Sequence, residues 1–222
     1  MKQHPYMESP EVLRAPLYKV LAFMQHRIMN SSTYFGVHTL KSPTDFWMYQ
    51  ELFYKIRPKV IVEIGNFKGG GLLAWAHLLD NLKIDGKVIG VDINQEGIAP
   101  LVKVHPKITL LEGNAFTSKM VSKVNSLVKD LSPVIVIDDS AHDYKSTLSS
   151  LRGYSVFVTV GSYFIVEDGI CWHGLNVGPK PGPYEAVETF LKEEQGKDFV
   201  LDRSQEAFLI TWNPKGYLKR VK

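Results

Sequence analysis

The chain has 222 residues, of which 45% are hydrophobic and 22% are charged, which is an ordinary composition for one globular domain. A formal net charge of +3 is too small to indicate a nucleic-acid partner. A single cysteine, Cys171, excludes an internal disulfide and a cysteine-based zinc site. The chain start lacks an apolar signal core and no apolar run is long enough to span a bilayer, so we expect a cytoplasmic protein without a membrane partner.

The first 57 residues are predicted to form a helical cap. Apolar residues recur at helical spacing over residues 8–30. A second helix is expected to begin at Ser42 and to end before Pro58. Between the two helices lie aromatic side chains that either cover a cofactor or belong to the core, namely Tyr34, Phe35 and His38.

From residue 58 onward, predicted strands and helices alternate. Apolar runs predict strands over residues 60–64, 88–92, 108–112, 134–138 and 163–167. The helices between them are expected over residues 71–82, 97–104, 118–131 and 144–151. Regular alternation of this kind is typical of an α/β protein, in which helices cover both faces of a mostly parallel sheet.

The pattern changes after the fifth strand. Residues 169–183 form a connection rich in glycine and proline, and loops of this length are often functional lids. A helix over residues 184–194 follows, and strands over 199–202 and 207–212 are predicted to close the sheet as an antiparallel hairpin. We expect a solvated tail for the basic cluster of Lys215, Lys219, Arg220 and Lys222. The chain is therefore predicted to be a single domain over 1–222, with a seven-stranded Rossmann-like core over 58–222.

A glycine-rich segment follows the first strand, where Glu63 precedes Gly65 and Asn66, and Gly69 and Gly70 come after. Glycine permits a tight turn and a close approach of the backbone to a ligand. The G-x-G-x-x-G pattern of dinucleotide-binding proteins is absent, because the second glycine is missing. Glu63 would also repel a pyrophosphate. The form E-x-G-x-x-x-G favours a positively charged cofactor without phosphates.

The ends of the next two strands extend this site. Asp92 can accept hydrogen bonds from ribose hydroxyls, and Asn114 lies where an adenine edge can bind. Together with the glycine-rich segment and the closing hairpin, these strand ends resemble the S-adenosylmethionine (SAM) site of the class I methyltransferases. The cofactor contacts expected from that resemblance are Glu63, Gly65, Asn66, Gly69, Gly70, Asp92, Ile93, Asn114, Ala115 and Asp138.

Two acidic clusters follow the fourth and fifth strands: Asp138-Asp139, with His142 shortly after, and Glu167-Asp168. Ligands of open α/β sheets bind just beyond the carboxyl ends of the strands. Carboxylates that meet at one edge repel each other and are costly to desolvate, so a bound cation is a natural explanation.

The acidic clusters carry a second resemblance. Together with segments 161–168, 181–187 and 202–220, the run from Asp139 to His142 resembles the cephalosporin hydroxylase-like family over residues 34–220. That family consists of SAM-dependent O-methyltransferases, including enzymes that act on rhamnose and other sugars. The run also resembles the D-G-S-H motif of macrolide sugar methyltransferases, from which it departs at Ser140 and Ala141.

The resemblance implies roles for four residues. Asp139, Glu167 and Asp168 would bind Mg²⁺, a hard ion that prefers oxygen ligands. The ion would bind two vicinal hydroxyls of a sugar or glycoside acceptor, and His142 would act as the general base. Asp138 as the metal ligand in place of Asp139, and a structural role for His142, remain open.

Other interpretations also remain open at this stage. An NAD-dependent oxidoreductase and a non-catalytic SAM-binding partner subunit are the alternatives to a methyltransferase. An iron hydroxylase is disfavoured, because it needs two histidines and a carboxylate on a β-barrel. His173 either contacts substrate or lies on the surface. The N-terminal helix either packs in the core or supports a homo-oligomer.

Overall fold

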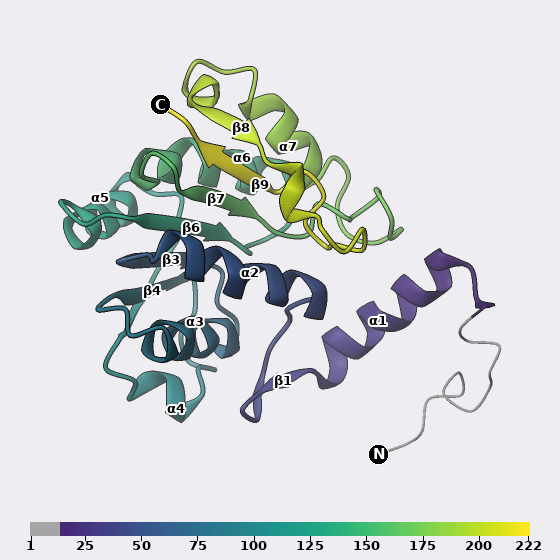
Figure 1. Cartoon of the computed structure of the whole chain (residues 1–222), viewed down its shortest axis with the longest axis horizontal. Helices are drawn as coiled ribbons and strands as arrows, with labels where there is room; N and C mark the ends of the chain where they lie inside the picture. The colour runs from purple at the N-terminus through teal and green to yellow at the C-terminus, as the bar shows by residue number, and fades with distance from the viewer. Residues whose placement is uncertain (1–13) are drawn as a thin grey trace.

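The computed structural model describes residues 14–222 (Figure 1). Its main sheet has seven strands in the order β5-β4-β3-β6-β7-β9-β8. The ladders from β5 to β7 are parallel, whereas β9 is antiparallel to both of its neighbours. The strands are β3 (Val60–Ile64), β4 (Lys87–Asp92), β5 (Ile108–Glu112), β6 (Val134–Asp138), β7 (Tyr163–Val166), β8 (Phe199–Leu201) and β9 (Tyr217–Arg220). This order confirms the predicted α/β class I methyltransferase fold.

Helices α2 to α7 cover both faces of the sheet. The helices of the chain are α1 (Leu17–Ser31), α2 (Pro43–Ile56), α3 (Gly70–Asn81), α4 (Pro100–Lys103), α5 (Ser118–Val128), α6 (Tyr144–Tyr154) and α7 (Pro183–Phe190). A separate two-stranded ribbon, β1 (Thr33–Tyr34) and β2 (Val37–His38), joins α1 to α2.

Alternating side chains of the strands build two cores. In β3, Ile61 packs with apolar residues of α2, α3 and α4, whereas Val62 packs with those of α5, α6 and α7. Strand residues point alternately to opposite faces, so an uninterrupted apolar run such as β3 fits a sheet covered on both sides. The resulting three layers hold the strand ends rigidly at one edge.

Helix α1 does not lie on either face of the sheet but extends beside the strand ends (Figure 1). Leu21 and Ile28 of α1 are buried against Ile170, Leu175 and Trp212. The N-terminal helix predicted over residues 8–30 therefore begins at Leu17, and its predicted first six residues lie outside the described part of the chain.

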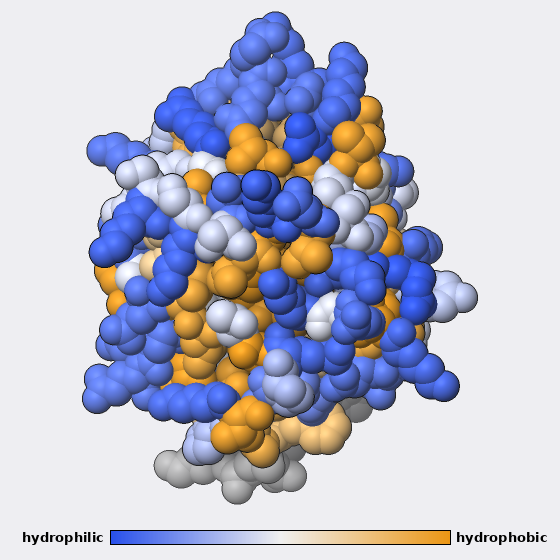
Figure 2. Space-filling view, turned by 90° about the vertical axis from the view of Figure 1, so that its left-hand side faces the viewer, coloured by the Kyte–Doolittle hydropathy of each residue, from blue (hydrophilic) through white to orange (hydrophobic). Residues whose placement is uncertain are grey.

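The other end of the molecule, on the left of Figure 1, lies opposite α1. Figure 2 shows that hydrophilic and hydrophobic side chains are intermingled there. Among the described residues, no helix is long and apolar enough to cross a membrane.

The predicted closing hairpin is wrong in its second strand. β8 pairs with Tyr217–Arg220, and residues 207–212 form a loop instead. In that loop Leu209 is 93% exposed, while the backbone N–H of Trp212 donates to a carboxylate oxygen of Asp45 at 2.7 Å. The end of this segment is thus held by a hydrogen bond to the Asp45 side chain and not by pairing with a strand.

The prediction of a solvated basic tail is wrong for Lys219 and Arg220, which belong to β9. β9 lies between two other strands, and both side chains are only partly exposed. The guanidinium of Arg220 donates to the backbone carbonyls of Val158 at 2.7 Å and Val156 at 3.2 Å. These contacts fix the end of the chain to the sheet.

Candidate cofactor and metal site

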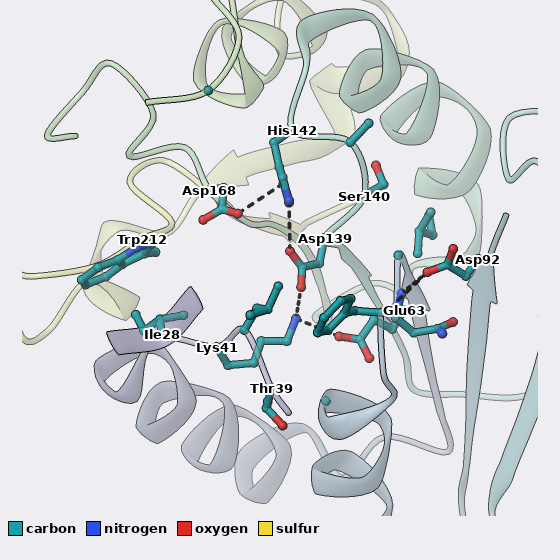
Figure 3. Close-up of a pocket in the computed structure, with 18 of the residues that line it drawn as sticks. Ile28, Thr39, Lys41, Glu63, Asp92, Asp139, Ser140, His142, Asp168 and Trp212 are labelled. Atoms are coloured by element: carbon teal, nitrogen blue, oxygen red, sulfur yellow. Dashed lines mark hydrogen bonds and ion pairs between the residues drawn. The ribbon is translucent and has the colours of Figure 1, made fainter. Parts of the chain in front are cut away.

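The parallel strands end at one edge of the sheet. In register, Ile64 of β3 pairs with Val91 of β4 and with Asp138 of β6, and Asp138 pairs with Val166 of β7. The residues after these strands therefore meet around a cavity of about 640 Å³, which is within the usual range for a small-molecule site (Figure 3).

Most of the residues predicted to bind the cofactor line this cavity. They are Glu63, Gly65, Asn66, Gly70, Asp92, Ile93, Asn114 and Ala115. Gly69 instead lies behind the turn, where a side chain would meet Val102 and Ile98. Asp138 is 3% exposed and also lies outside the described lining.

At Gly65 the turn after β3 lies directly against the segment that follows β6. The Gly65 φ of +80° is in the left-handed region, and an added Cβ would lie 2.2 Å from the carbonyl oxygen of Asp139. On either side, the N–H of Gly65 donates to Val91 and the N–H of Asp139 donates to Ile64, both at 2.8 Å. Only glycine fits both the conformation and the space.

The carboxylate of Asp92 holds the glycine-rich turn. Its Oδ2 accepts hydrogen bonds from the backbone N–H groups of Asn66 at 2.9 Å and Phe67 at 3.1 Å. Its Oδ1 accepts one from the N–H of Asn94 at 3.2 Å. A carboxylate has about four acceptor positions, so these three bonds leave about one, on Oδ1, for a ligand hydroxyl.

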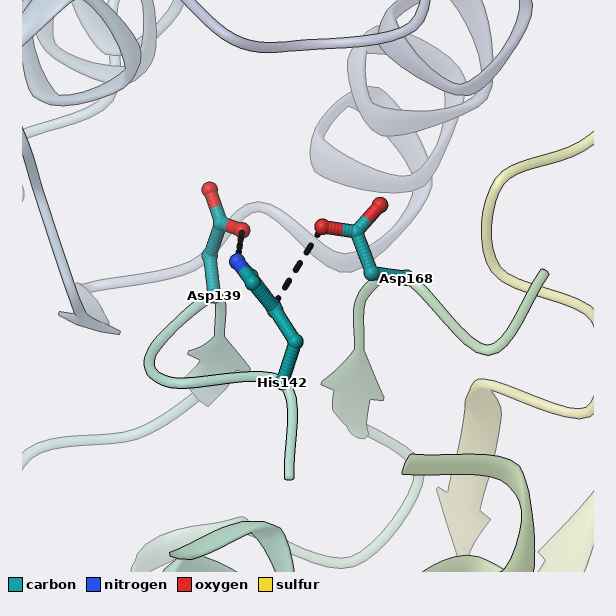
Figure 4. Close-up of side chains that lie close together, drawn as sticks. All are labelled: Asp139, His142 and Asp168. Atoms are coloured by element: carbon teal, nitrogen blue, oxygen red, sulfur yellow. Dashed lines mark ion pairs between the residues drawn. The ribbon is translucent and has the colours of Figure 1, made fainter. Parts of the chain in front are cut away.

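Asp139, His142 and Asp168 form an open cluster at the mouth of the cavity (Figure 4). Nδ1 of His142 lies 3.3 Å from Oδ2 of Asp168, and Nε2 lies 3.9 Å from Oδ1 of Asp139. Potential ligand atoms of the three residues lie within 4.8 Å of one another, a spacing at which they can hold a metal ion.

A second acidic cluster lies deeper and contains Glu63, Asp139 and Glu167. The ammonium of Lys41 pairs with all three: it donates to Asp139 and Glu167, both at 2.6 Å, and lies 2.8 Å from an oxygen of Glu63. Tyr49 donates its hydroxyl to the same oxygen of Glu167, Oε1, at 2.6 Å. Of the three predicted metal ligands, Asp139 belongs to both clusters, Glu167 to the deep one and Asp168 to the open one.

Burial and neighbouring charges together shift the pKa values of Lys41, Glu167 and His142. Burial lowers the pKa of Lys41, but the attraction of Asp139, Glu167 and Glu63 outweighs burial and the pKa is raised well above its ordinary value. The pKa of Glu167 is raised by burial and by the neighbouring negative charge of Asp139. For His142 burial lowers the pKa, yet Asp168 and Asp139 raise it above its usual value.

Asp138 differs from Asp139 in its surroundings. It does not belong to the described cavity lining, and in the described structure its Oδ1 is buried without a hydrogen-bond partner. Burial raises the pKa of Asp138 to about 6. Asp139, in contrast, lines the cavity and contacts both Lys41 and His142.

The end of the cavity next to the open cluster is apolar. Helix α1 contributes Ile28 and Met29, and the loop over residues 169–183 contributes Ile170 and Leu175. Trp212 also lines it, and donates its indole N–H to Gln25 of α1 at 2.6 Å. The long loop thus forms a wall of the cavity, as a functional connection would.

Of the remaining aromatic and histidine candidates, one lines the cavity and the others do not. His38 lines the cavity, whereas Tyr34 lies 3.2 Å from a ring nitrogen of His77 and Phe35 is 72% exposed. His173 lies outside the described lining, stacked on Tyr184 at 3.7 Å between ring centroids and paired with Glu185 at 2.9 Å.

Three contributors were missed from the sequence: Lys41, Tyr49 and Trp212. A buried acidic cluster requires a counter-charge, so a buried cation was to be expected. With 26 lysines and arginines in the chain, composition does not identify which one. Trp212 was assigned to a strand, so its position at the cavity was not foreseen.

Comparison with known proteins places this site in a family. The model of the family described as rhamnosyl O-methyltransferase/CmcI matches residues 26–221. The chain belongs to this family. The methyltransferase identification made from the sequence is therefore confirmed, and the oxidoreductase alternative is not.

Individual relatives agree with the family match. The chain is 30% identical over 197 residues to a rhamnosyl O-methyltransferase from Mycobacterium leprae, covering 87% of this chain and 85% of that protein. A structure of CmcI with Mg and SAM is 26% identical, with a TM-score of 0.67 over 86% of this chain and 77% of that one. MycE, a methyltransferase from the mycinamycin biosynthetic pathway, shares the fold with a TM-score of 0.56 at 16% identity, covering 94% of this chain and 54% of that one.

Proposed function

We propose that the protein is a Mg²⁺-dependent, SAM-dependent O-methyltransferase that methylates a hydroxyl of a sugar or glycosylated metabolite. The observation that carries the proposal is the open cluster of Asp139, His142 and Asp168 beside the cavity wall built by the glycine-rich turn. The related CmcI structure with Mg and SAM, and the rhamnosyl O-methyltransferase relative, support this assignment.

The residues present fit both cofactors. Asp139, Glu167 and Asp168 supply hard oxygen donors, which suit Mg²⁺, and Asp139 offers Oδ1 on the side away from Lys41. Glu63 lines the same cavity next to the glycine-rich turn, with its carboxylate paired with Lys41. Asp92 and Asn114 provide polar groups for the nucleoside of SAM.

The proposed reaction transfers a methyl group from the SAM sulfonium to an acceptor oxygen. When bound, Mg²⁺ lowers the pKa of an acceptor hydroxyl and orients it. Asp168 faces Nδ1 of His142 and favours the tautomer with its proton there. Nε2 of His142 is then free to accept the hydroxyl proton as general base. Correct positioning of the two reactants by the cavity walls supplies much of the rate.

The acceptor is placed at the apolar end of the cavity, beside the open cluster. There Ile28, Ile170 and Trp212 surround space next to Asp168, so a polar hydroxyl pair and a less polar remainder of the acceptor are both accommodated. Sugars combine vicinal hydroxyls with apolar C–H faces that stack on aromatic rings such as Trp212. This match supports a sugar or glycoside as the acceptor class.

The proposal is tested with radiolabelled SAM and a panel of rhamnosides and other glycosides, each with Mg²⁺ or with EDTA. We expect methyl transfer to at least one glycoside, and its loss with EDTA and in Asp139→Asn. Transfer that persists undiminished in EDTA would refute the role of the metal. A melting temperature raised by S-adenosylhomocysteine but no transfer to any sugar would overturn the acceptor class.

A further inference from the structure

Lys41 is the residue whose role neither the fold nor the proposed reaction explains. It precedes α2, and its side chain is 5% exposed. Its ammonium lies within 2.8 Å of three different carboxylates: it donates hydrogen bonds to Asp139 and Glu167 and forms an ion pair with Glu63. Figure 3 shows Lys41 between Asp139 and Glu63. The three carboxylates follow or belong to three adjacent strands of the sheet.

The position of the ammonium coincides with a cation site. Oxygen atoms of Glu63, Asp139 and Glu167 lie within 4.8 Å of one another, close enough to hold a metal ion. The same is true of Asp139, His142 and Asp168, and Asp139 is common to both groups. Two clusters that share a carboxylate lie side by side, so a second ion at the position of the ammonium would make a two-metal centre.

We propose that Lys41 is a built-in cation that occupies the second position of this centre, so that the site takes one divalent ion instead of two. The four carboxylates of the two clusters carry four negative charges, of which the ammonium balances one and a divalent ion at the outer position balances two. Lys41 contacts Oδ2 of Asp139 and leaves Oδ1 toward the open cluster. This inference rests on the magnesium site of the proposed function.

A catalytic role for the Lys41 amine is disfavoured by the same contacts. A general base or a nucleophile needs a free lone pair, which an ammonium lacks. The ammonium of Lys41 donates to Asp139 and Glu167 at 2.6 Å and pairs with Glu63 at 2.8 Å. Lys41 is therefore a positioning residue that acts through Asp139 and Glu167.

The experiment compares the number of Mn²⁺ ions bound by the full chain and by Lys41→Ala, with free Mn²⁺ measured by electron paramagnetic resonance. Lys41→Ala removes the ammonium and leaves room for an ion, so we expect one ion per wild-type chain and two per variant. The melting temperature of Lys41→Ala should be lower without metal, because three buried carboxylates lose their partner. Added Mn²⁺ should raise it by more than it raises that of the wild type.

Two controls separate charge from volume and from surface effects. Lys41→Met fills the space without a charge, and is expected to lose stability without gaining a second ion. Lys55→Met on α2 removes an exposed lysine and is expected to behave as the wild type.

Equal Mn²⁺ stoichiometry and equal stabilisation by Mn²⁺ in Lys41→Ala and the wild type would overturn the inference. A Lys41→Ala chain that remains unfolded even with Mn²⁺ would overturn it as well, because a divalent ion should replace the ammonium. A wild type that binds no Mn²⁺ would refute the proposed metal site, whereas the role of Lys41 is judged from the difference between variant and wild type.

Discussion

Asp168 and His142 face each other across the ends of two neighbouring strands, with 3.3 Å between Oδ2 and Nδ1. The histidine follows β6 and the aspartate follows β7, so the sheet itself sets their separation. The imidazole is consequently held with one nitrogen toward Asp168 and the other toward Asp139, 3.9 Å away. A histidine that acts as a general base needs a fixed ring orientation, so that the nitrogen that accepts the proton points at the reacting hydroxyl.

Replacement of His142 tests its role as the base. We expect His142→Gln to lower kcat by about 10²- to 10⁴-fold, the usual contribution of a general base, with little change in the Kd for S-adenosylhomocysteine. Steady-state kinetics and calorimetric titration measure the two quantities. His173→Gln is the matched control, because His173 pairs with Glu185 outside the described cavity lining. Equal effects of the two substitutions would argue for a structural role of His142.

Gly65 offers a second test, because its neighbour across the site is Asp139. Gly65→Ala combines a left-handed φ with a Cβ 2.2 Å from the Asp139 carbonyl. Gly161 has a similar φ of +86° but nothing within 4 Å of an added Cβ. Gly161→Ala should therefore cost about 1 kcal/mol of unfolding free energy, from the backbone strain alone. Gly65→Ala should cost more and also weaken SAM binding. Urea unfolding of both variants gives the comparison, and equal losses would contradict the importance of the close approach.

The central strands were predictable because nearly all of their side chains are buried between the two layers of helices. The run Val134–Asp138 is apolar and rich in β-branched residues since both faces of β6 are covered by helices. The acidic residues that follow such runs lie at the same edge of the sheet. The proximity of Asp139 and Asp168 could therefore also be predicted from the sequence.

Other features depend on contacts between distant residues and were not predictable. Tyr217–Arg220 forms a strand although half of it is basic, because its backbone pairs with β7 and β8. The Arg220 side chain donates to carbonyls more than 60 positions away. Lys41 and Glu167 are separated by 126 positions and meet only when α2 packs on the sheet. A local pattern carries no information about such pairs, whose partners are set by the tertiary fold.

The burial of Asp138 makes stability depend on pH. The pKa of its carboxyl is raised from 3.8 to about 6 by burial, so the folded state holds the proton more tightly than the unfolded state. The stability that proton binding to Asp138 contributes is fully present below about pH 4 and is lost as the pH rises through about 6. A pKa difference of this size corresponds to about 3 kcal/mol.

We expect Asp138→Asn to remove this dependence. Urea unfolding at several pH values between 4 and 7, in EDTA, should show the variant gaining stability relative to the wild type as the pH rises, with a constant difference above about pH 6. Asp85→Asn, at a fully exposed position, should track the wild type. A difference between Asp138→Asn and the wild type that does not change with pH would show that Asp138 is not protonated preferentially in the folded state.

The bond between Trp212 and Gln25 connects the C-terminal loop to α1 at the apolar end of the cavity. Trp212→Phe keeps an aromatic ring but removes the N–H donor, at a cost of about 0.5–1.5 kcal/mol for one hydrogen bond. If α1 and this loop bind the acceptor, the KM for the acceptor should rise about two- to tenfold. The Kd for S-adenosylhomocysteine should stay unchanged, because the turn after β3 is not altered. Trp47→Phe is the matched control, since its indole donates to Glu51 on the exposed surface of α2 at 3.2 Å. A weaker affinity for S-adenosylhomocysteine with an unchanged KM for the acceptor would reverse the assignment of the two ends of the cavity.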